Sequence, residues 1–448
     1  MNTNYDELFK TLIKAYYNES FEETVLKLLS NESLDKTALS RVISSLCGVD
    51  IKYDNNYTEN LKKAIANYEI HHKIVQKIKN CSMDCVNSTG KTLCQTSCPF
   101  DAILIDKDTH KTYIDNNKCT DCGFCVDVCP TGSIVDRIEF IPLIHLLNKE
   151  STVIAAVAPS IIGQFGENVT IHQLRTAFKK IGFTDMVEVA FFADMLTIKE
   201  AVEFNTLVKT KDDFMITSCC CPMWIGMLKR LYSNLIDHVS PSVSPMIASG
   251  KVLKTLNPHC KVVFIGPCIA KKAEAKEKDL IGIIDYVLTF QELKDIFVSL
   301  NISPEELEED TSTEYASREG RIYARTGGVS IAISEAIENL FPEKAKFLKV
   351  IHGDGVKECR EILNKLEKGE IHANFIEGMG CIGGCVGGPK VNIPKEKGKE
   401  LVDKFAENSE IQISLNNECM NNILKQININ SVQDFTDKEK VRIFKRDL

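Results

Sequence analysis

Four closely spaced cysteines form the most informative chemical pattern in the sequence. They follow the order C-x2-C-x2-C-x3-C with a proline directly after the last, and they are Cys119, Cys122, Cys125 and Cys129. Such short separations let one tight loop direct three thiolates at a single iron–sulfur cubane, whereas the cysteine before the proline ligates the neighbouring cluster in two-cluster ferredoxins. The spacing therefore predicts a [4Fe-4S] site in preference to the alternatives, free cysteines or a zinc knuckle.

A second, looser set of cysteines lies upstream, with spacings of x3, x8 and x3: Cys81, Cys85, Cys94 and Cys98. Its end, CPFDAI, parallels the CPTGSI that closes the first set, so we interpret it as a divergent first half with a longer loop, VNSTGKTL. Because the last cysteines cross over, cluster one is expected to bind Cys81, Cys85, Cys94 and Cys129. Cluster two is expected to bind Cys98, Cys119, Cys122 and Cys125. The irregular spacing leaves one alternative open, in which one site is lost or filled by zinc.

Three more cysteine motifs follow in the rest of the chain: TSCCCPMW from Thr217, GPCIAKKAEA from Gly266 and EGMGCIGGCVGGP from Glu377. Glycines flank the third motif, as expected where the backbone must approach a bulky group closely. Four cysteines drawn from these three loops suit one more cubane. Lys271, in the second motif, would then place a cation beside an anionic cluster.

The elements that must position these motifs alternate between short apolar runs and amphipathic segments. The expected strands are STVIAAVA, DMVEVAFF, DFMITS, KVVFIG, IIDYVLTF and FLKVIHG. The clearest expected helices between them are VTIHQLRTAFKKIG and VKECREILNKLEKG. This alternation predicts an α/β domain with a largely parallel sheet, in which ligands gather where strands end. The three motifs come after DFMITS, KVVFIG and ANFIEGMG, and so belong at such strand ends.

We predict three parts in the chain. Residues 1–78 form a helical N-terminal segment, since FEETVLKLL from Phe21 and the run from Leu61 to Lys79 carry apolar residues near helical spacing. Residues 79–140 form a small ferredoxin-like domain with two [4Fe-4S] clusters, which is too loop-rich to be stable by apolar burial alone. Residues 141–448 form the α/β catalytic domain, with parallel sheets around an iron–sulfur active site.

Composition narrows the class of protein further. The net charge of -8 and the lack of a long basic stripe exclude a nucleic-acid role, and the longest apolar runs are too short to span a membrane. The N-terminus does not resemble a secretory signal, so we expect a cytoplasmic protein, where eighteen cysteines favour metal or redox chemistry over disulfides. Isolated residues are expected to be packing residues rather than ligands: Cys47, Cys260, Cys359, Cys419 and the His71–His72 pair.

The three motifs in this order, behind a two-cluster ferredoxin domain, resemble the signature segments of the iron-only, or [FeFe], hydrogenases. The resemblance covers about residues 80–390, and the triple cysteine of the first motif is most similar to group B of that family. It implies the reversible conversion of two protons and two electrons to dihydrogen. It also implies an H-cluster, which is a [4Fe-4S] cubane joined through a cysteine sulfur to a two-iron subsite with carbon monoxide, cyanide and azadithiolate ligands.

By position in these motifs, the resemblance implies four cubane ligands, of which the last bridges to the two irons: Cys221, Cys268, Cys381 and Cys385. It implies that Lys271 hydrogen-bonds one cyanide. It implies that the loop Ala158, Pro159 and Ser160 cradles the other cyanide, and it assigns Met379 to cofactor binding. The chain departs from the usual family pattern in several places, among them Gly266 in place of methionine, Met246 in place of glutamine, and a shorter GGPK end to the third motif.

The resemblance also implies a proton route, in which a cysteine beside the azadithiolate exchanges protons with carboxylates and a serine. The candidates are Cys220, Glu200, Glu203 and Ser240. The alternative for the two glutamates is a solvated helix face. The three adjacent cysteines leave the register open, because Cys219 or Cys220 could be the relay and Cys220 or Cys221 the ligand. We favour Cys220 and Cys221, counting back from the Pro222 and Trp224 of the motif.

The expected partners are ferredoxin or a similar electron carrier, and the maturation proteins that build the H-cluster. The sequence gives no indication of the oligomeric state. Two other functions use much of the same cysteine framework, namely a non-catalytic cytosolic iron–sulfur assembly factor and a hydrogen sensor. Cys220, Lys271 and the Ala158–Ser160 loop serve the two-iron subsite specifically, and they favour the enzyme over the assembly factor.

Overall fold

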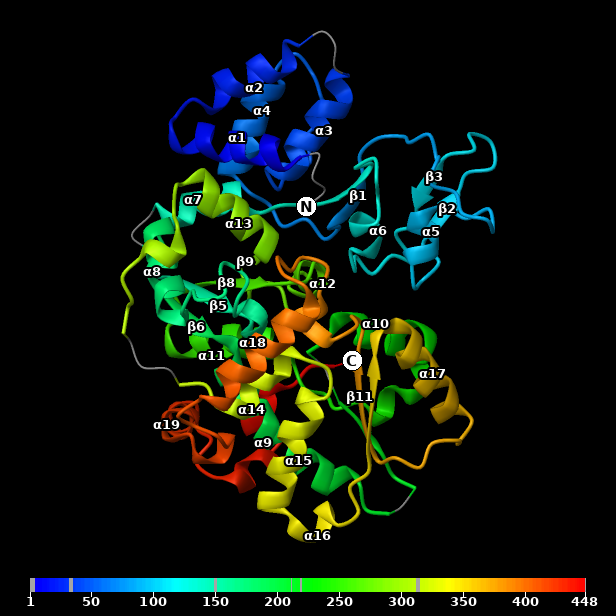
Figure 1. The fold of residues 1–448 in the computed structure, drawn as a ribbon, viewed down its shortest axis with the longest axis vertical. Helices are drawn as coiled ribbons and strands as arrows, with labels where there is room; N and C mark the ends of the chain where they lie inside the picture. Colours follow the sequence, from blue (N-terminus) through cyan, green and yellow to red (C-terminus); the bar gives the residue numbers. More distant parts are fainter. Residues whose placement is uncertain are drawn as a thin grey trace.

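The computed structural model describes residues 5–31, 35–148, 151–210, 212–217, 220–311 and 315–447. Figure 1 shows the N-terminal helices at one end, the cysteine-rich unit beside them, and a larger α/β region that makes up the rest of the molecule. The α/β region contains two parallel sheets, as the alternating sequence pattern predicts.

The four N-terminal helices pack on the α/β region and do not stand apart from it. They are α1 (Asp6–Tyr17), α2 (Phe21–Leu29), α3 (Lys36–Leu46) and α4 (Tyr57–Ala66). Helix α1 contacts α13 (Phe290–Ser299), and α4 contacts α7 (Phe140–Leu147). Buried apolar side chains such as Phe9 and Leu61 are therefore continuous with the core of the larger sheet.

The prediction of a helix from Leu61 to Lys79 is wrong in its second half. Helix α4 ends at Ala66, and Val75–Lys77 forms strand β1, which pairs antiparallel with β4 (Ile134–Asp136). The Asp121 carboxylate also accepts hydrogen bonds from the backbone of Ile74 and Val75, at 3.2 and 2.8 Å. This pairing outweighs a helical pattern of apolar residues, because long-range hydrogen bonds and packing override local propensity.

The cysteine-rich unit is built from short elements: α5 (Leu93–Ser97), β2 (Ile103–Ile105), β3 (Thr112–Ile114) and α6 (Phe124–Asp127), together with β1 and β4. Strands β2 and β3 pair antiparallel. Its small core combines apolar side chains with cysteines, including Cys94, Cys125 and Cys129. Since β1 belongs to its sheet, we propose that this unit begins at Val75 and not at residue 79.

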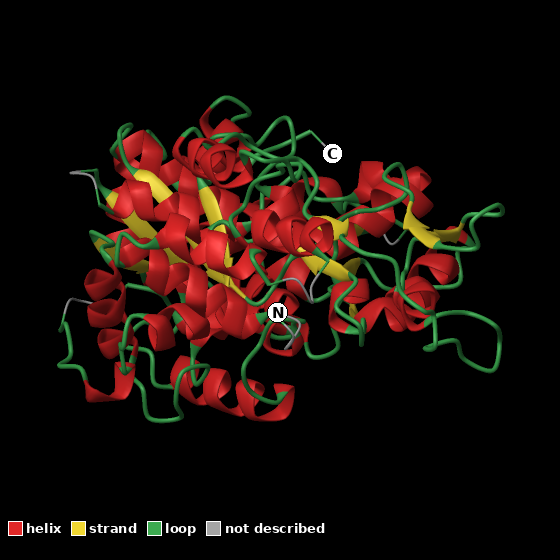
Figure 2. Ribbon diagram, turned by 90° about the horizontal axis from the view of Figure 1, so that it is seen from above, coloured by secondary structure: helices red, strands yellow, loops and turns green. Residues whose placement is uncertain are grey.

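The larger sheet has the strand order β6-β5-β8-β9, and all of its pairings are parallel. Its strands are β5 (Val153–Val157), β6 (Asp185–Glu188), β8 (Lys261–Gly266) and β9 (Tyr286–Thr289). The smaller sheet, β10-β11-β7, is also parallel. Its strands are β7 (Met215–Ile216), β10 (Val350–Asp354) and β11 (Phe375–Met379). Figure 2 shows these strands surrounded by helices.

The helices of the α/β region cover both sheets and join them. The longer ones are α8 (Ile171–Ile181), α9 (Val189–Leu207), α10 (Pro222–Leu231), α11 (Pro245–Leu256), α15 (Gly328–Leu340), α17 (Gly355–Glu367), α18 (Lys395–Glu407) and α19 (Glu418–Gln426). Three short ones are α12 (Ala270–Glu274), α14 (Arg318–Arg321) and α16 (Pro342–Ala345). Helix α9 is buried from Val189 to Phe204 except at Phe191, and it supplies residues to the site described below.

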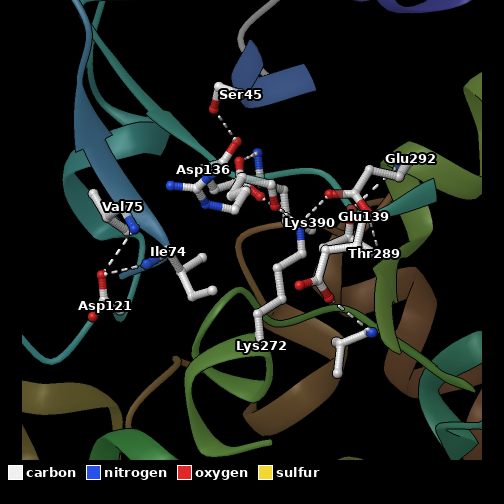
Figure 3. A network of polar contacts seen from close by, with 12 residues as sticks. Ser45, Ile74, Val75, Asp121, Asp136, Glu139, Lys272, Thr289, Glu292 and Lys390 are labelled. Carbon is white, nitrogen blue, oxygen red and sulfur yellow. Dashed lines mark hydrogen bonds and ion pairs between the residues drawn. The ribbon is translucent and has the colours of Figure 1, made fainter. Parts of the chain in front are cut away.

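A buried network of charges fastens the cysteine-rich unit to the α/β region (Figure 3). The Lys272 ammonium donates to Asp136 Oδ2 and to the Arg137 carbonyl, both at 2.8 Å, and it also pairs with Glu292. Lys390 lies 3.5 Å from Asp136 Oδ1. Burial opposes ionisation of Asp136, but the two lysines outweigh it and hold the pKa of that carboxyl below its usual value.

This network connects β4, α12, α13 and the segment after the third cysteine motif. Removing one partner of a buried ion pair leaves the other charge unpaired and typically costs about 3–5 kcal/mol. The charges therefore fix the second and third motifs against the cysteine-rich unit.

Candidate iron–sulfur active site

The eight cysteines of the cysteine-rich unit form two groups, each around its own hollow. The first lines a cavity of about 170 Å³ and consists of Cys81, Cys85, Cys94 and Cys129. The second consists of Cys98, Cys119, Cys122 and Cys125. The structure thus brings together the two crossed sets of cysteines that the sequence suggested.

The surroundings of these thiols suit a cluster of several irons. The Sγ atoms of Cys94 and Cys129 lie 3.2 and 3.6 Å from the hydroxyls of Thr92 and Thr131. The backbone N–H of Ala102 donates to Cys98 Sγ at 3.2 Å. Among the described residues, no three His, Cys, Asp or Glu side chains converge on a position for one metal ion.

The three later motifs meet at the ends of strands. The first follows β7, the second follows β8 and the third follows β11. They bring together four thiols: Cys221, Cys268, Cys381 and Cys385. The Gly380 N–H donates to Cys221 Sγ at 3.3 Å, across the two loops.

These four thiols are partly buried, and they interact with one another. Burial and then the Cys221 thiol raise the pKa of Cys268 to about 11 and that of Cys385 to about 12. Three neighbouring thiols with raised pKa values, those of Cys268, Cys381 and Cys385, form a poor arrangement for free cysteines. Iron binding would resolve it, because metal binding drives off the thiol protons. The donor set therefore fits a third cubane.

The four thiols of the later motifs, those of Cys221, Cys268, Cys381 and Cys385, form a third group, which lies next to the second. Cys122 is close enough to Cys268 and Cys381 for their charges to affect one another. A cluster held by Cys122 would therefore adjoin a cluster held by the later motifs. The residues that line the 170 Å³ cavity of the first group include none of the four thiols of the later motifs.

A small cavity of about 50 Å³ lies beside the third group. Its lining includes Ala158, Pro159, Cys220, Lys271 and Cys385. Apolar side chains line much of the rest of this cavity, among them Met246, Phe264 and Tyr323. Next along the chain after Pro159, the buried Ser160 hydroxyl has no hydrogen-bond partner in the described part of the chain. A cation, a thiol and an unsatisfied hydroxyl close to Cys385 fit a metal group that carries small anionic ligands.

Two residues predicted for cofactor binding differ in their placement. Lys271 lines this cavity, and its ammonium also donates to Glu274 Oε2 at 2.5 Å. Burial disfavours the charge on Lys271, but Glu274 outweighs that effect and the pKa of the lysine is raised. Met379 is buried in β11, where it packs behind Cys220 and Cys221 and does not line the cavity.

Three of the predicted proton-relay residues, Glu200, Glu203 and Ser240, are buried and connected. Glu200 and Glu203 on α9 are only 4% and 9% exposed, so the alternative of a solvated helix face is wrong. The Ser240 hydroxyl donates to Glu203 Oε2 at 2.7 Å, and the Thr217 hydroxyl donates to Glu200. Burial raises the pKa of Glu200 to about 7. Burial, together with Cys385 and Cys221, also raises the pKa of the Cys220 thiol, which keeps it protonated.

Sequence reasoning missed three residues of this connected group: Thr217, Ser242 and Lys199. Lys199 pairs with Glu203 four positions later, a spacing that is detectable in a sequence once the helix is known. No sequence signal identifies Thr217 or Ser242, since short hydroxyl side chains occur throughout the chain. Cys219 lies outside the described residues, so the register of the three adjacent cysteines stays a prediction.

The isolated cysteines and histidines take structural positions. Cys47, Cys260 and Cys359 are buried among apolar side chains, and Cys419 is partly exposed. The ring of His72 contacts the Lys276 carbonyl at 3.1 Å. Within the described ranges, no helix is long and apolar enough to cross a membrane.

Two family models match the chain. The one described as iron only hydrogenase large subunit, C-terminal domain, matches residues 151–389, and the one described as 4Fe-4S dicluster domain matches residues 79–133. These ranges contain the three groups of cysteines and the small cavity. The first match spans more than half of the chain.

Known proteins show the same similarity. The chain is 30% identical to Iron hydrogenase 1 of Clostridium pasteurianum, over 67% of this chain and 68% of that protein. It is 30% identical to the NADP-reducing hydrogenase subunit HndD of Solidesulfovibrio fructosivorans, but it spans only 55% of that protein. It is 24% identical to Cytosolic iron-sulfur assembly component 3 of Mus musculus, over 66% of this chain and 75% of that protein.

A solved structure shares the fold. It is a variant of the [FeFe]-hydrogenase HydA1 from Chlamydomonas reinhardtii, with a TM-score of 0.55 and 20% sequence identity. The similarity covers 68% of this chain and 97% of that one. At this identity the likeness shows the fold alone, and it includes the parallel sheets described above.

Proposed function

Because this chain belongs to the iron-only hydrogenase family, we propose that it is an [FeFe]-hydrogenase that interconverts two protons and two electrons with dihydrogen. The observation that carries this proposal is the small cavity where Cys220, Lys271 and Cys385 meet the Ala158–Pro159 loop. An iron–sulfur electron carrier alone would need the cubane thiols but not this cavity. The family matches confirm the resemblance to [FeFe]-hydrogenases that was inferred from the motifs, whereas membership of group B stays a prediction.

Four thiolates would hold the cubane of the H-cluster: Cys221, Cys268, Cys381 and Cys385. The subsite would occupy the small cavity, with the Lys271 ammonium and the Ser160 hydroxyl as donors to its cyanide ligands. When bound, the H-cluster supplies the redox chemistry that joins protons and electrons into dihydrogen and the reverse. The apolar lining from Met246 and Phe264 excludes water from the site, and so strengthens the interactions of the charged groups inside.

The chain's own residues would carry protons between the surface and this cavity. The Cys220 thiol faces the cavity and stays protonated, so it can both give and accept a proton there. Glu200, with a pKa of about 7, is suited to recharge it near neutral pH. Glu203 and Ser240 continue the route outward through their 2.7 Å hydrogen bond.

Electrons would enter through the cysteine-rich unit. A cluster bound by Cys98, Cys119, Cys122 and Cys125 would adjoin the active-site cubane, whereas the other cluster would lie one step further out. We propose ferredoxin or a similar carrier as the electron partner, maturation proteins as the source of the two-iron subsite, and the cytoplasm as the location. The oligomeric state is left open.

Similarity to the iron–sulfur assembly component supports one competing function, a non-catalytic assembly factor. A hydrogen sensor of the same family would share the complete site and differ in its partners. The two alternatives differ from each other in the two-iron subsite, which the assembly factor does not need. Cys220 and Lys271 at the small cavity therefore favour a hydrogenase-type site over the assembly factor.

Hydrogen turnover and iron content together test the proposed function. Protein produced anaerobically with H-cluster maturation proteins should evolve hydrogen from a reduced viologen dye and should contain about 14 irons, from three cubanes and a two-iron subsite. Protein produced without those maturation proteins is the control, and it should contain about 12 irons and be inactive. About 8 irons or fewer in active protein would contradict the assignment of the third group.

A further inference from the structure

Lys199 is a fully buried lysine within the proposed proton route. It precedes Glu200 on α9 and lies one turn before Glu203, with 0% of its surface exposed. Its ammonium donates to Glu203 Oε1 at 2.6 Å and to Ser242 Oγ at 2.7 Å. Burying a lysine is costly unless the charge is paired, and an apolar side chain would pack here at lower cost.

The hydrogen bonds around Lys199 form a closed ring. The Ser240 hydroxyl donates to Glu203 Oε2 at 2.7 Å, and it lies 2.8 Å from the Ser242 hydroxyl, which in turn accepts from Lys199. An ammonium only donates and a carboxylate only accepts, so the directions at both ends of the ring are fixed. The single proton of Ser242 must therefore point toward Ser240 or toward the Glu200 carboxyl, with which Ser242 also interacts.

We propose that Lys199 is the positioning residue of the proton relay: it pairs with the Glu203 carboxylate and orients Ser242, so that Glu200 carries the transferred proton. This inference rests on the proposed function, since it assigns a role within the same site. In this arrangement Ser242 links Glu200 to Glu203, a role that no sequence motif indicates.

Proton movement through this arrangement balances at every atom. When Glu200 gives a proton toward the cavity, its carboxylate takes the proton of Ser242. Before this, Glu203 has gained a proton from a hydronium ion of the solvent, which leaves as water, and the Ser240 hydroxyl has turned from Glu203 toward Ser242. Ser242 then takes the proton of Ser240, and Ser240 takes one from the protonated Glu203. Lys199 keeps its three protons throughout. Dihydrogen oxidation would use the same steps in reverse.

The charge of Lys199 has few competitors around Glu200. Among the described residues, the groups that face Glu200 from the surrounding elements include Lys199 and Glu203 on α9, Thr217 after β7, Ser242 before α11, and Tyr323 after α14. Lys445, near the C-terminus, faces Glu203 and Lys199 from outside. Burial raises the pKa of Glu200 to about 7, and Lys199 is the largest opposing influence.

Replacing Lys199 by methionine should therefore move the titration of Glu200 to higher pH. Hydrogen oxidation needs Glu200 as a proton acceptor, so its rate rises as pH rises through that pKa. Loss of a cation that neighbours a carboxyl group raises the pKa of that group by about one unit or more. We expect the rising limb of the pH–rate profile for hydrogen oxidation to move to higher pH by at least about one unit. At pH values below this limb, oxidation should be about tenfold slower than in the native protein.

A readout that does not depend on turnover is the infrared carbonyl band of protonated Glu200, followed against pH and assigned by its loss in Glu200→Gln. This band should persist to higher pH in Lys199→Met by the same interval. Lys251→Met is the matched control, because the Lys251 ammonium donates to the Lys445 carbonyl at 3.0 Å, and Lys445 itself faces Glu203 and Lys199. It should leave both curves in place.

A folded Lys199→Met protein whose Glu200 band titrates as in the native protein would overturn the proposal, whatever its activity. If that variant fails to fold, Lys199→Gln keeps an N–H donor without the charge, and the same shift is expected. Native protein with a complete H-cluster and no hydrogen turnover would refute the proposed function instead. The infrared titration would still decide the role of Lys199 in that case.

Discussion

Replacing Cys220 by serine should remove most hydrogen turnover while leaving the iron content unchanged. The Cys220 thiol lines the small cavity and is not one of the four thiols assigned to the cubane. Serine has a similar shape, but its hydroxyl is far less acidic than a thiol, whose reference pKa is about 8.5. Losing a general acid–base group typically slows an enzyme by about 10²–10⁴-fold, and we expect a loss in this range. Turnover rates and iron analysis of the purified variant provide the measurement.

Two neighbouring variants decide the register of the triple cysteine. Cys221→Ser should lower the iron content, because it removes a cubane ligand, whereas Cys219→Ser should have little effect. Cys359→Ser is the matched control, since Cys359 is buried behind the site, where its thiol donates to the Met379 carbonyl at 3.4 Å. If Cys219→Ser abolished turnover with its clusters intact and Cys220→Ser lost iron, the register would be wrong by one residue. Full activity of Cys220→Ser with clusters intact would show that protons reach the site by another path.

Replacing Cys122 by alanine should separate two kinds of electron donor. Cys122 belongs to the second group of thiols and adjoins Cys268 and Cys381. Without this ligand, the cluster next to the active site should be lost or impaired, so a ferredoxin donor should lose nearly all of its activity. A small viologen dye can deliver electrons closer to the active site and should retain much more. The measurement is the ratio of the two activities, compared with the native ratio.

Cys260→Ala is the control for this variant, because Cys260 is buried and isolated in the larger α/β region. Its ratio of ferredoxin to viologen activity should match that of the native protein. An equal loss of both activities in Cys122→Ala, with the other clusters intact by iron analysis, would mean that the cysteine-rich unit has only a structural role.

Much of the fold follows from the sequence because apolar runs and motif positions are local signals. KVVFIG corresponds to β8, and the three motifs do follow strands β7, β8 and β11. Boundaries were less predictable. Only Asp185–Glu188 of the run DMVEVAFF forms a strand, and the next residues begin α9 because they pack in the interior as a helix. The strand at Val75–Lys77 depends on β4, which lies almost sixty residues later, so no local pattern could indicate it.

The candidate site shows the same division. Cysteine spacing was sufficient to propose the two crossed sets of four thiols, because each loop is short and its geometry is constrained. The burial of Glu200 and Glu203 was not predictable from charge, since glutamates on helices are usually exposed. Lys199 and Ser242 become part of the site only when α9 and the segment before α11 lie side by side. Such contacts between distant segments are visible only in the folded chain.

The infrared spectrum of the anaerobically purified protein tests the central claim most directly. Protein produced together with H-cluster maturation proteins should show cyanide and carbon monoxide stretching bands, because only the two-iron subsite carries those ligands. The bands should change when dihydrogen replaces an inert gas above the sample, as expected if the subsite reacts with it. A protein with all three cubanes but without these bands would contradict the account, since an assembly factor would then explain the same cysteines.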